Sequence, residues 1–399
     1  MINLAKITSR IKLGELCYLV TKGTTPTSVG LEFTDSGVPF LRIQNLCNRS
    51  VKLENVLYIS EQTHLTLKRS IVKPKDFLIT IAGTIGRVAI VPDNFPECNC
   101  NQAVAILRFD YEKLNPQYLL HWLDTPDAFG QISGRKVTAT ISNFSLGQIK
   151  ELEIPLPPLA EQQKIASVLD AADSLRQKDQ QLIEKYNALS QSLFLEMFGD
   201  PVNNLMGWDK VELATLGKIS SGSTPSREVN EYYVGNIPWV KTGEVNSTKI
   251  IKTSECISEV ALKNSSCKLY PAGSLIIAMY GQGKTRGQVG MLGIEATTNQ
   301  ACAVIPPSSN MNYDYLFMLL KLSYEDLRRL GRGGNQPNLN SGLIKSYCVI
   351  SPPIALQNQF AERIQLIEAQ KQLAQASLQK SEALFNSLLQ RAFKGELTT

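Results

Sequence analysis

The chain has 399 residues, of which 43% are apolar and 19% charged, and its formal net charge is +5. This composition is typical of a globular protein and excludes an intrinsically disordered chain. No apolar run is long enough for a membrane-spanning helix, and the N-terminus shows no signal peptide, so we expect a cytoplasmic protein. The length exceeds one typical domain, and two or three domains are expected.

Eight cysteines are scattered along the chain, and Cys98 and Cys100 form the only close pair. The two histidines, His64 and His121, lie far from this pair in sequence. A structural zinc site needs about four Cys or His ligands at short spacings, which this pattern lacks. We therefore expect free thiols and no metal site.

The strongest feature of the sequence is an internal repeat with an offset of about 195 to 201 residues. The matching stretches include "IKLGELCYLVTKGTTPT" (11–27) with "VELATLGKISSGSTPS" (211–226), "CNQAVAIL" (100–107) with "TNQACAVI" (298–305), and "IKELEIPLPPLAEQQKI" (149–165) with "IKSYCVISPPIALQNQF" (344–360). The chain is thus a tandem duplication of one unit, a globular part followed by a long helix.

The globular part of each copy has mixed secondary structure. Short apolar runs such as "FLITIA" (77–82) and "SLIIAMY" (274–280) predict strands, whereas "NPQYLLHWLDT" and "NYDYLFMLLKLS" predict short amphipathic helices. We expect an α+β fold with two mixed α/β domains at residues 1–155 and 201–350, each followed by a helical segment, at residues 156–200 and 351–399.

The helical segments begin after Pro-Pro pairs and continue for nearly forty residues, or about 57 Å at 1.5 Å per residue. Apolar residues at spacings of three and four predict a coiled-coil seam, which Asp179 interrupts in the first helix and Lys371 and Ser381 interrupt in the second. The predicted seam residues are Ile165, Val168, Ala172, Leu175, Leu182, Tyr186, Leu189 and Leu193, and then Phe360, Ile364, Ile367, Ala374, Leu378, Phe385 and Leu388. Because the chain is duplicated, the two helices are expected to pair antiparallel.

One stretch, "AMYGQGKTRGQVG" (278–290), nearly matches the phosphate-binding P-loop pattern. A P-loop follows a strand and opens a helix, but the residues after Arg286 show no helical periodicity. The equivalent stretch of the first copy, "AGTIGRVAI" (82–90), has no Gly-Lys-Thr. We therefore expect neither nucleotide binding nor any other cofactor in this chain, and no catalytic constellation can be assembled.

Glycine followed closely by a cation recurs in both copies, and backbone amides with Lys or Arg suit a nucleic-acid phosphate or a guanine edge. Hydroxyl-bearing loops and an Asn side chain add further hydrogen-bonding groups. The predicted DNA-binding residues are Lys22, Thr24, Thr25, Arg42, Arg87, Arg135 and Lys136 in the first copy, and Thr224, Lys241, Lys284, Thr285, Arg286, Arg332 and Asn335 in the second.

Taken together, these motifs resemble the DNA-specificity subunit of type I restriction-modification systems, over essentially the whole chain. The resemblance implies two target recognition domains that each recognise one half of a bipartite, asymmetric site on double-stranded DNA, separated by an antiparallel coiled coil. It implies no catalysis in this chain. It also implies two modification subunits that methylate adenine with S-adenosylmethionine, and restriction subunits that use ATP and Mg. Helices of this length suit half-sites about one to one and a half helical turns apart.

Two alternatives remain open at this point. One is a duplicated ligand-binding scaffold that does not bind DNA. The other is a nucleotide-binding enzyme that uses the stretch 278–285. DNA affinity that falls steeply with salt is expected only from the specificity subunit, and nucleotide binding by the isolated chain would favour the enzyme.

Overall fold

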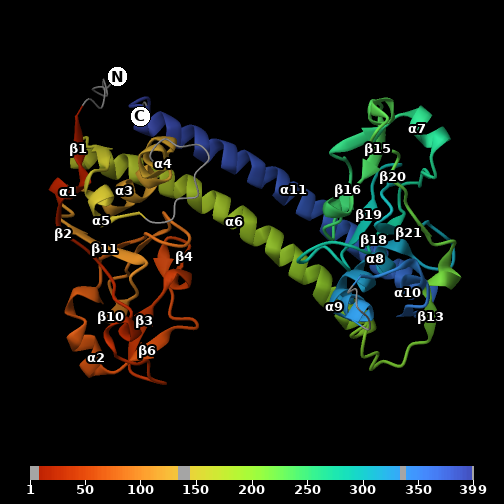
Figure 1. Cartoon of the computed structure of the whole chain (residues 1–399), viewed down its shortest axis with the longest axis horizontal. Coiled ribbons are helices and arrows are strands. Elements are labelled where there is room, and N and C mark those ends of the chain that lie inside the picture. Colours follow the sequence, from red (N-terminus) through yellow and green to blue (C-terminus); the bar gives the residue numbers. More distant parts are fainter. Residues whose placement is uncertain (1–8, 134–143, 333–337, 398–399) are drawn as a thin grey trace. The chain divides into compact units, whose positions relative to one another are not determined.

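The computed structural model describes residues 9–133, 144–332 and 338–397. The chain divides into two compact units, Met1–Asp179 with Ala376–Thr399, and Gln180–Gln375. Each unit contains one copy of the repeat and half of each long helix (Figure 1). No helix in the described part of the chain is long and apolar enough to cross a membrane.

The globular part of the first unit contains two four-stranded sheets. One is antiparallel, in the order β2-β11-β8-β9, with β2 (Cys17–Lys22), β11 (Val104–Phe109), β8 (Phe77–Thr80) and β9 (Val88–Ile90). The other, in the order β6-β3-β10-β7, has β6 (Leu57–Ile59), β3 (Val38–Leu41), β10 (Cys98–Cys100) and β7 (Ile71–Val72), with β3 and β10 parallel. The pairs β1 (Arg10–Lys12) with β12 (Glu153–Pro155) and β4 (Leu46–Cys47) with β5 (Ser50–Val51) complete the strands, and the helices are α1 (Leu13–Leu16), α2 (Glu61–Thr66), α3 (Pro116–Leu123), α4 (Pro126–Ser133) and α5 (Leu146–Lys150).

Side-chain alternation along β8 and β11 explains the layers of this unit. Successive residues of a strand point to opposite faces. Phe77 and Ile79 pack in the core shared with α3 and the long helices, whereas Leu78 packs in the core shared with the second sheet. Both faces are therefore buried, which is why "FLITIA" is an uninterrupted apolar run.

The second unit repeats this arrangement. Its five-stranded sheet has the order β14-β21-β18-β19-β16, with β14 (Ser220–Ser221), β21 (Cys302–Ile305), β18 (Leu275–Ala278), β19 (Val289–Leu292) and β16 (Lys249–Ile250). A three-stranded sheet follows the order β17-β15-β20, with β17 (Glu255–Ile257), β15 (Ile237–Val240) and β20 (Thr297–Thr298). The remaining elements are β13 (Lys210–Glu212) paired with β22 (Cys348–Ile350), and the helices α7 (Glu259–Asn264), α8 (Tyr313–Leu322), α9 (Tyr324–Arg329) and α10 (Ser341–Lys345).

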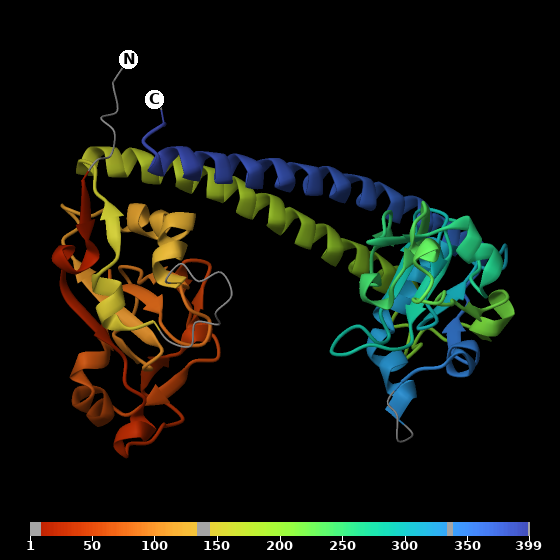
Figure 2. The ribbon, with the colours of Figure 1, turned by 45° about the horizontal axis from the view of Figure 1, so that its top comes forward.

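The two long helices are α6 (Leu159–Phe198) and α11 (Ile354–Phe393), each of 40 residues. In the first unit, the N-terminal half of α6 packs against the C-terminal half of α11, and in the second unit the other halves pack together, so the helices are antiparallel (Figure 2). Gly199, with a φ of 73°, ends α6 in the left-handed conformation. These observations confirm the predicted fold of two mixed α/β domains with an antiparallel coiled coil.

Two polar residues that interrupt the predicted seam meet each other. The Asp179 carboxylate accepts hydrogen bonds from the hydroxyls of Ser377, at 3.1 Å, and Ser381, at 2.8 Å. Asp179 and Ser381 are both buried. A buried polar contact of this kind favours one register of a helix pair, because any other register leaves the carboxylate without donors.

The predicted seam of α6 is partly wrong. The structure buries Ile165 and Ala172 as expected, but Leu169, Ile183 and Phe194 share that buried side. Four predicted seam residues are exposed instead, each with 39 to 50% of its surface accessible: Val168, Leu175, Leu182 and Leu189. The error arises because the helix buries the positions four residues after Ile165 and Asp179 rather than three, Leu169 and Ile183 in place of Val168 and Leu182, and both spacings fit a heptad.

Candidate nucleic-acid interface

The hairpin between β8 and β9 carries Arg87, and the side chain of Thr80 fixes its conformation. The backbone N–H of Thr80 donates to the carbonyl of Arg87 at 2.8 Å, and the N–H of Gly86 donates back to Thr80 at 3.0 Å. The buried Thr80 hydroxyl donates to the carbonyl of Thr84 at 2.5 Å and accepts from the N–H of Arg87 at 2.9 Å. The Arg87 side chain is left exposed at the end of the hairpin.

The equivalent hairpin of the second unit connects β18 and β19 and contains the P-loop-like stretch. The N–H of Ala278 donates to Gln288 at 2.9 Å, and the N–H of Gly287 donates to Ala278 at 2.8 Å, as in the first unit. A strand follows, not a helix, so the helix N-terminus on which a P-loop depends is replaced here by β19. Lys284 is exposed, whereas Thr285 and Arg286 are partly buried.

The Gly-x-Thr loops of both copies pack on a repeated Asn-Gln pair. The Thr25 hydroxyl donates to the side-chain oxygen of Gln102, and the Thr224 hydroxyl donates to that of Gln300. The N–H of Thr24 is also used, donating to the carbonyl of Cys100 at 3.0 Å. A Cβ atom at Gly23 would lie 2.1 Å from the carbonyl oxygen of Cys100, so this close approach requires glycine.

This contact gives the predicted Thr24, Thr25 and Thr224 a structural role in both copies. The exposed Gln102 and Gln300 are polar groups that the residue prediction missed. The repeated "NQA" in the two copies was the signal that could have identified them.

Arg42 and Lys241 occupy equivalent positions after β3 and β15 but differ in their partners. Arg42 donates through Nη2 to the carbonyl of Asn55 at 3.0 Å. Lys241 forms an ion pair of 2.7 Å with Glu255, and hydrogen bonds from Lys241 and Arg227 lower the pKa of that carboxyl group. Lys241 is thus partly neutralised, whereas Arg42 keeps its charge without a carboxylate partner among the described residues.

Some predicted residues lie together and others cannot be placed. In the first unit, Gly83 of the hairpin lies against Ile43, the neighbour of Arg42, while Lys22 is exposed at the end of β2. Within the described part of the chain, the buried Nε atoms of Arg42 and Arg286 have no hydrogen-bond acceptor. Arg135, Lys136, Asn335 and the Arg332 side chain lie outside the described residues.

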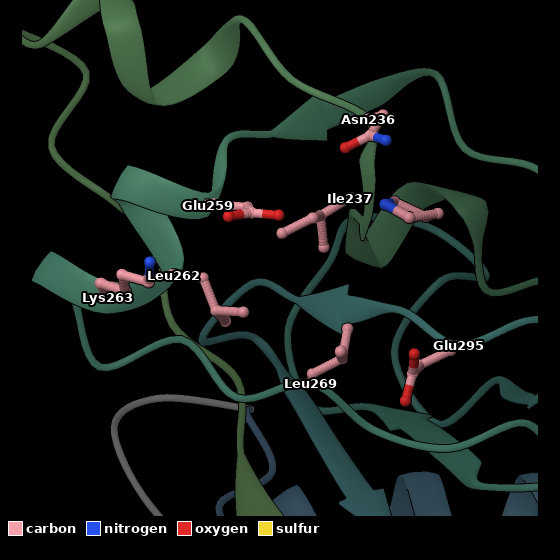
Figure 3. A pocket seen from close by; sticks show the side chains of 8 residues that line it. Asn236, Ile237, Glu259, Leu262, Lys263, Leu269 and Glu295 are labelled. Atoms are coloured by element: carbon pink, nitrogen blue, oxygen red, sulfur yellow. The ribbon is translucent and has the colours of Figure 1, made fainter.

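A pocket of about 410 Å³ opens between α7 and β15 of the second unit (Figure 3). Its charged side chains are Glu259, Glu295 and Lys263. None of the predicted DNA-binding residues that the structure describes lines it. Its two carboxylates would repel a phosphate, so we do not place nucleic acid there.

Burial governs the chemistry of the thiols. The eight cysteines are free, and burial raises the pKa of Cys17, Cys98 and Cys302 to about 12. Because the thiolate is the nucleophile and the metal ligand, these cysteines are structural rather than reactive.

The fold and these hairpins define a class of protein: two copies of one α/β unit, each packed on the same pair of antiparallel helices and each presenting a polar hairpin of different composition. Type I restriction modification DNA specificity domains match the chain twice, over residues 9–185 and 206–382. The chain therefore belongs to this family, as its motifs predicted, and it is a specificity subunit rather than a catalytic subunit of a type I system.

Individual relatives agree with this assignment. The specificity subunit of type I restriction enzyme MjaIX from Methanocaldococcus jannaschii is 26% identical over 386 residues, which cover 89% of this chain and 86% of that protein. The EcoR124I/EcoR124II specificity subunit of Escherichia coli is 27% identical over 276 residues, 63% of each chain. The crystal structure of the S subunit from M. genitalium has the same fold, with a TM-score of 0.59 and 18% identity over 98% of this chain and 99% of that one.

Proposed function

We propose that the two recognition domains, residues 1–155 and 201–350, each bind one half of a bipartite, asymmetric DNA site. The observation that carries this proposal is that the two copies share their framework and differ in their hairpins. Seven residues, 81–87, connect β8 to β9 and include one cation, Arg87, whereas ten residues, 279–288, connect β18 to β19 and include Lys284 and Arg286. Different polar groups on the same framework suit different base pairs.

The helix pair, in this proposal, sets the distance between the half-sites. Each helix is 40 residues long, or about 60 Å. The buried contact between Asp179 and Ser381 supports a fixed register. Changing the length of both helices together should therefore change the number of base pairs between the half-sites.

The exposed side of α6 supports the docking of modification subunits. Val168, Leu175, Leu182 and Leu189 recur every seven residues, so they lie along one side of the helix as an apolar stripe. We propose that this stripe binds modification subunits, which supply S-adenosylmethionine-dependent adenine methylation. Restriction subunits would add ATP- and Mg-dependent cleavage, and no cofactor is assigned to the present chain.

The test is to map methylated adenines across the genome of the host with and without this gene. We expect one asymmetric motif, with two short specified parts and an unspecified gap, to lose methylation when the gene is deleted and to regain it when the gene is restored. A genome whose methylation is unchanged by the deletion, or whose lost motif is contiguous, would contradict the proposal.

Inserting seven residues into the middle of both α6 and α11 tests the spacing. Seven residues add two helical turns, about 10 Å, so the gap should lengthen by about three base pairs. The same insertion into α6 alone is the control, because it breaks the pairing and should abolish methylation. A methylation-competent double insertion with the original gap would contradict the spacing role.

A further inference from the structure

The hairpin of the second unit lacks the internal restraint that holds the first. Ala278 occupies the position of Thr80, since each donates its N–H to the residue that begins the returning part of the hairpin, Gln288 or Arg87. Ala278 has no hydroxyl to fix the loop. The loop is also longer, and Gly281, Gly283 and Gly287 all have positive φ values. Glycine restricts the backbone least, so this sequence alone would leave the loop with many conformations.

Two side chains from α9 contact this loop through its backbone. The Tyr324 hydroxyl donates to the carbonyl of Lys284 at 2.6 Å. Arg328 donates through Nη1 to the carbonyl of Gly283 at 2.9 Å and more weakly to that of Arg286 at 3.4 Å. The contacts therefore hold the backbone on both sides of Lys284 without using its ammonium group.

The side chains of Tyr324 and Arg328 also contact each other. Tyr324 and Arg328 are one helical turn apart, Arg328 Nη1 lies 2.5 Å from the Tyr324 hydroxyl, and the guanidinium carbon lies 5.3 Å from the centre of the ring. The loop approaches closely enough that a Cβ atom at Gly287 would lie 2.8 Å from Cγ of Arg328. No residue that the structure describes lies within 4 Å of a Cβ atom at the equivalent Gly86. Among the described residues, the contact with α9 therefore has no counterpart at Gly86.

We infer that Tyr324 and Arg328 are positioning residues that fix the DNA-facing loop 281–287 for recognition of the second half-site. Arg328 acts through the carbonyl oxygens of the loop and not as a DNA contact of its own. The loop is rigid before DNA binds, so Lys284 and Arg286 are presented without the cost of ordering a glycine-rich segment. This inference rests on the proposed function, because it assumes that the loop faces DNA.

The experiment uses the chain assembled with its modification subunits, and DNA duplexes that carry the motif found by methylation mapping. Matched duplexes have one base pair changed in the first or the second half. Tyr324→Phe removes one hydroxyl and no charge, so the ratio of methylation rates between the correct and the altered second half should fall about fivefold, the worth of one hydrogen bond. Arg328→Ala should lower it about tenfold, because a charged donor is lost. Discrimination in the first half should stay unchanged in both variants.

Tyr313→Phe is the matched control, since the Tyr313 hydroxyl donates to the carbonyl of Pro306 at 2.5 Å in the same unit but away from the hairpin. It should leave discrimination unchanged. Arg328→Lys keeps the charge but loses the guanidinium group that lies against the Tyr324 ring and reaches the loop through Nη1, and we expect it to resemble Arg328→Ala.

Equal losses in both halves, or no loss in either, would overturn the positioning role. The double variant Lys284→Ala/Arg286→Ala separates this failure from that of the proposed function. If the double variant loses discrimination in the second half and Tyr324→Phe does not, the loop faces DNA and only the positioning role is wrong. If neither variant loses discrimination in the second half, the loop does not face DNA, and both the positioning role and the proposed function of the loop are wrong.

Discussion

The two units attach their globular domains to the long helices by one contact that they share and one that differs. The shared contact is a buried glutamine in the first turn of each helix. Gln162 accepts from the N–H of Asn115 at 2.9 Å and donates to the carbonyl of Pro157 at 2.9 Å, and Gln357 accepts from Asn312 at 2.9 Å and donates to Pro352 at 2.8 Å. The duplication has thus preserved, in both copies, this contact between the globular domain and the first turn of the long helix.

Further along the helices, the first unit uses charges. Arg49 lies 2.5 Å from Asp124, the residue after α3, and 3.3 Å from the buried Asp173 of α6. His121 accepts from Arg49 at 3.2 Å and donates to Asp170 of α6 at 2.8 Å, a pattern that requires a neutral imidazole with its proton on Nε2. Burial raises the pKa of Asp124, and Arg49 opposes that rise.

The second unit uses apolar packing at the equivalent positions. Met318 replaces His121, and the rings of Phe194, Tyr315 and Phe360 pack together, with Phe194 and Tyr315 stacked at 5.5 Å. Lys321 replaces Asp124, and its pKa is lowered by burial and by Lys371. Both units therefore have an apolar core against the long helices, with Tyr118 on Phe393 in the first and Tyr315 on Phe194 in the second, and the first unit adds the ionic network around Arg49.

The largest expected effect comes from removing the centre of the ionic network. Arg49→Ala removes the cation shared by Asp124 and the buried Asp173, although Arg176 still pairs with Asp173 at 2.5 Å. Because Arg49 and Asp124 are partly exposed, the loss should cost about 2 kcal/mol, less than for a fully buried ion pair. Denaturant unfolding of the purified chain should therefore show a lower free energy of unfolding.

The matched control for this variant is Thr248→Ala. Thr248 occupies the position of Arg49, since each accepts a hydrogen bond through its carbonyl from the neighbouring strand, β19 or β9. Thr248 is exposed, so its substitution should change stability by less than about 0.5 kcal/mol. Equal losses in the free energy of unfolding for the two variants would show that the two positions contribute equally to stability.

The fold class could be predicted because the duplication shows the main strands and helices twice. "FLITIA" and "SLIIAMY" contain the strands β8 and β18, and α6 and α11 have about the length that the sequence predicts. The seam of α6 could not be predicted, because Val168 and Leu175 fit a heptad as well as Leu169 and Ile183 do. The tertiary packing of α6, which its own sequence does not contain, decides which of them is buried.

The next largest effect is on the local stability of the two hairpins, one restrained by Thr80 and the other by Tyr324. Thr80→Val keeps the shape of the side chain but leaves the carbonyl of Thr84 and the N–H of Arg87 without the Thr80 hydroxyl. Two lost hydrogen bonds at a buried residue should destabilise the first hairpin by about 2 kcal/mol. Faster hydrogen exchange of the Arg87 amide would report this change, with the second hairpin unchanged. The reciprocal pattern is expected for Tyr324→Phe, and exchange that rises in both hairpins in either variant would contradict independent restraints.

The predicted DNA-binding residues show where sequence reasoning stops. Repetition pointed to polar loops at matching places, but it could not distinguish a free hydroxyl from one bonded to a neighbour, as for Thr25 with Gln102. It also could not show that Lys241 pairs with Glu255, because these residues are brought together by β15 and β17. Tyr324 and Arg328 lie about forty residues from the loop that they contact, and no local pattern relates them to it.

The smallest expected effect tests whether the hairpins divide the DNA site between them. Lys284→Ala/Arg286→Ala should weaken DNA binding by the assembled complex about tenfold and make binding insensitive to base changes in the second half. Arg87→Ala should do the same for the first half. If the lost contacts are to phosphates, the slope of log K against log salt should become shallower by about 0.9 for each contact, whereas base contacts leave the slope nearly unchanged.

Lys263→Ala is the control for this experiment, because it removes one positive charge from the second unit at a residue that lines the acidic pocket. It should alter neither the slope nor the preference for either half, and ATP hydrolysis by the partner subunits should continue in every variant. If Arg87→Ala and the double variant affected the same half of the site, the assignment of one half to each copy would be wrong. Opposite halves would establish that the difference between seven and ten connecting residues is a difference in what each copy recognises.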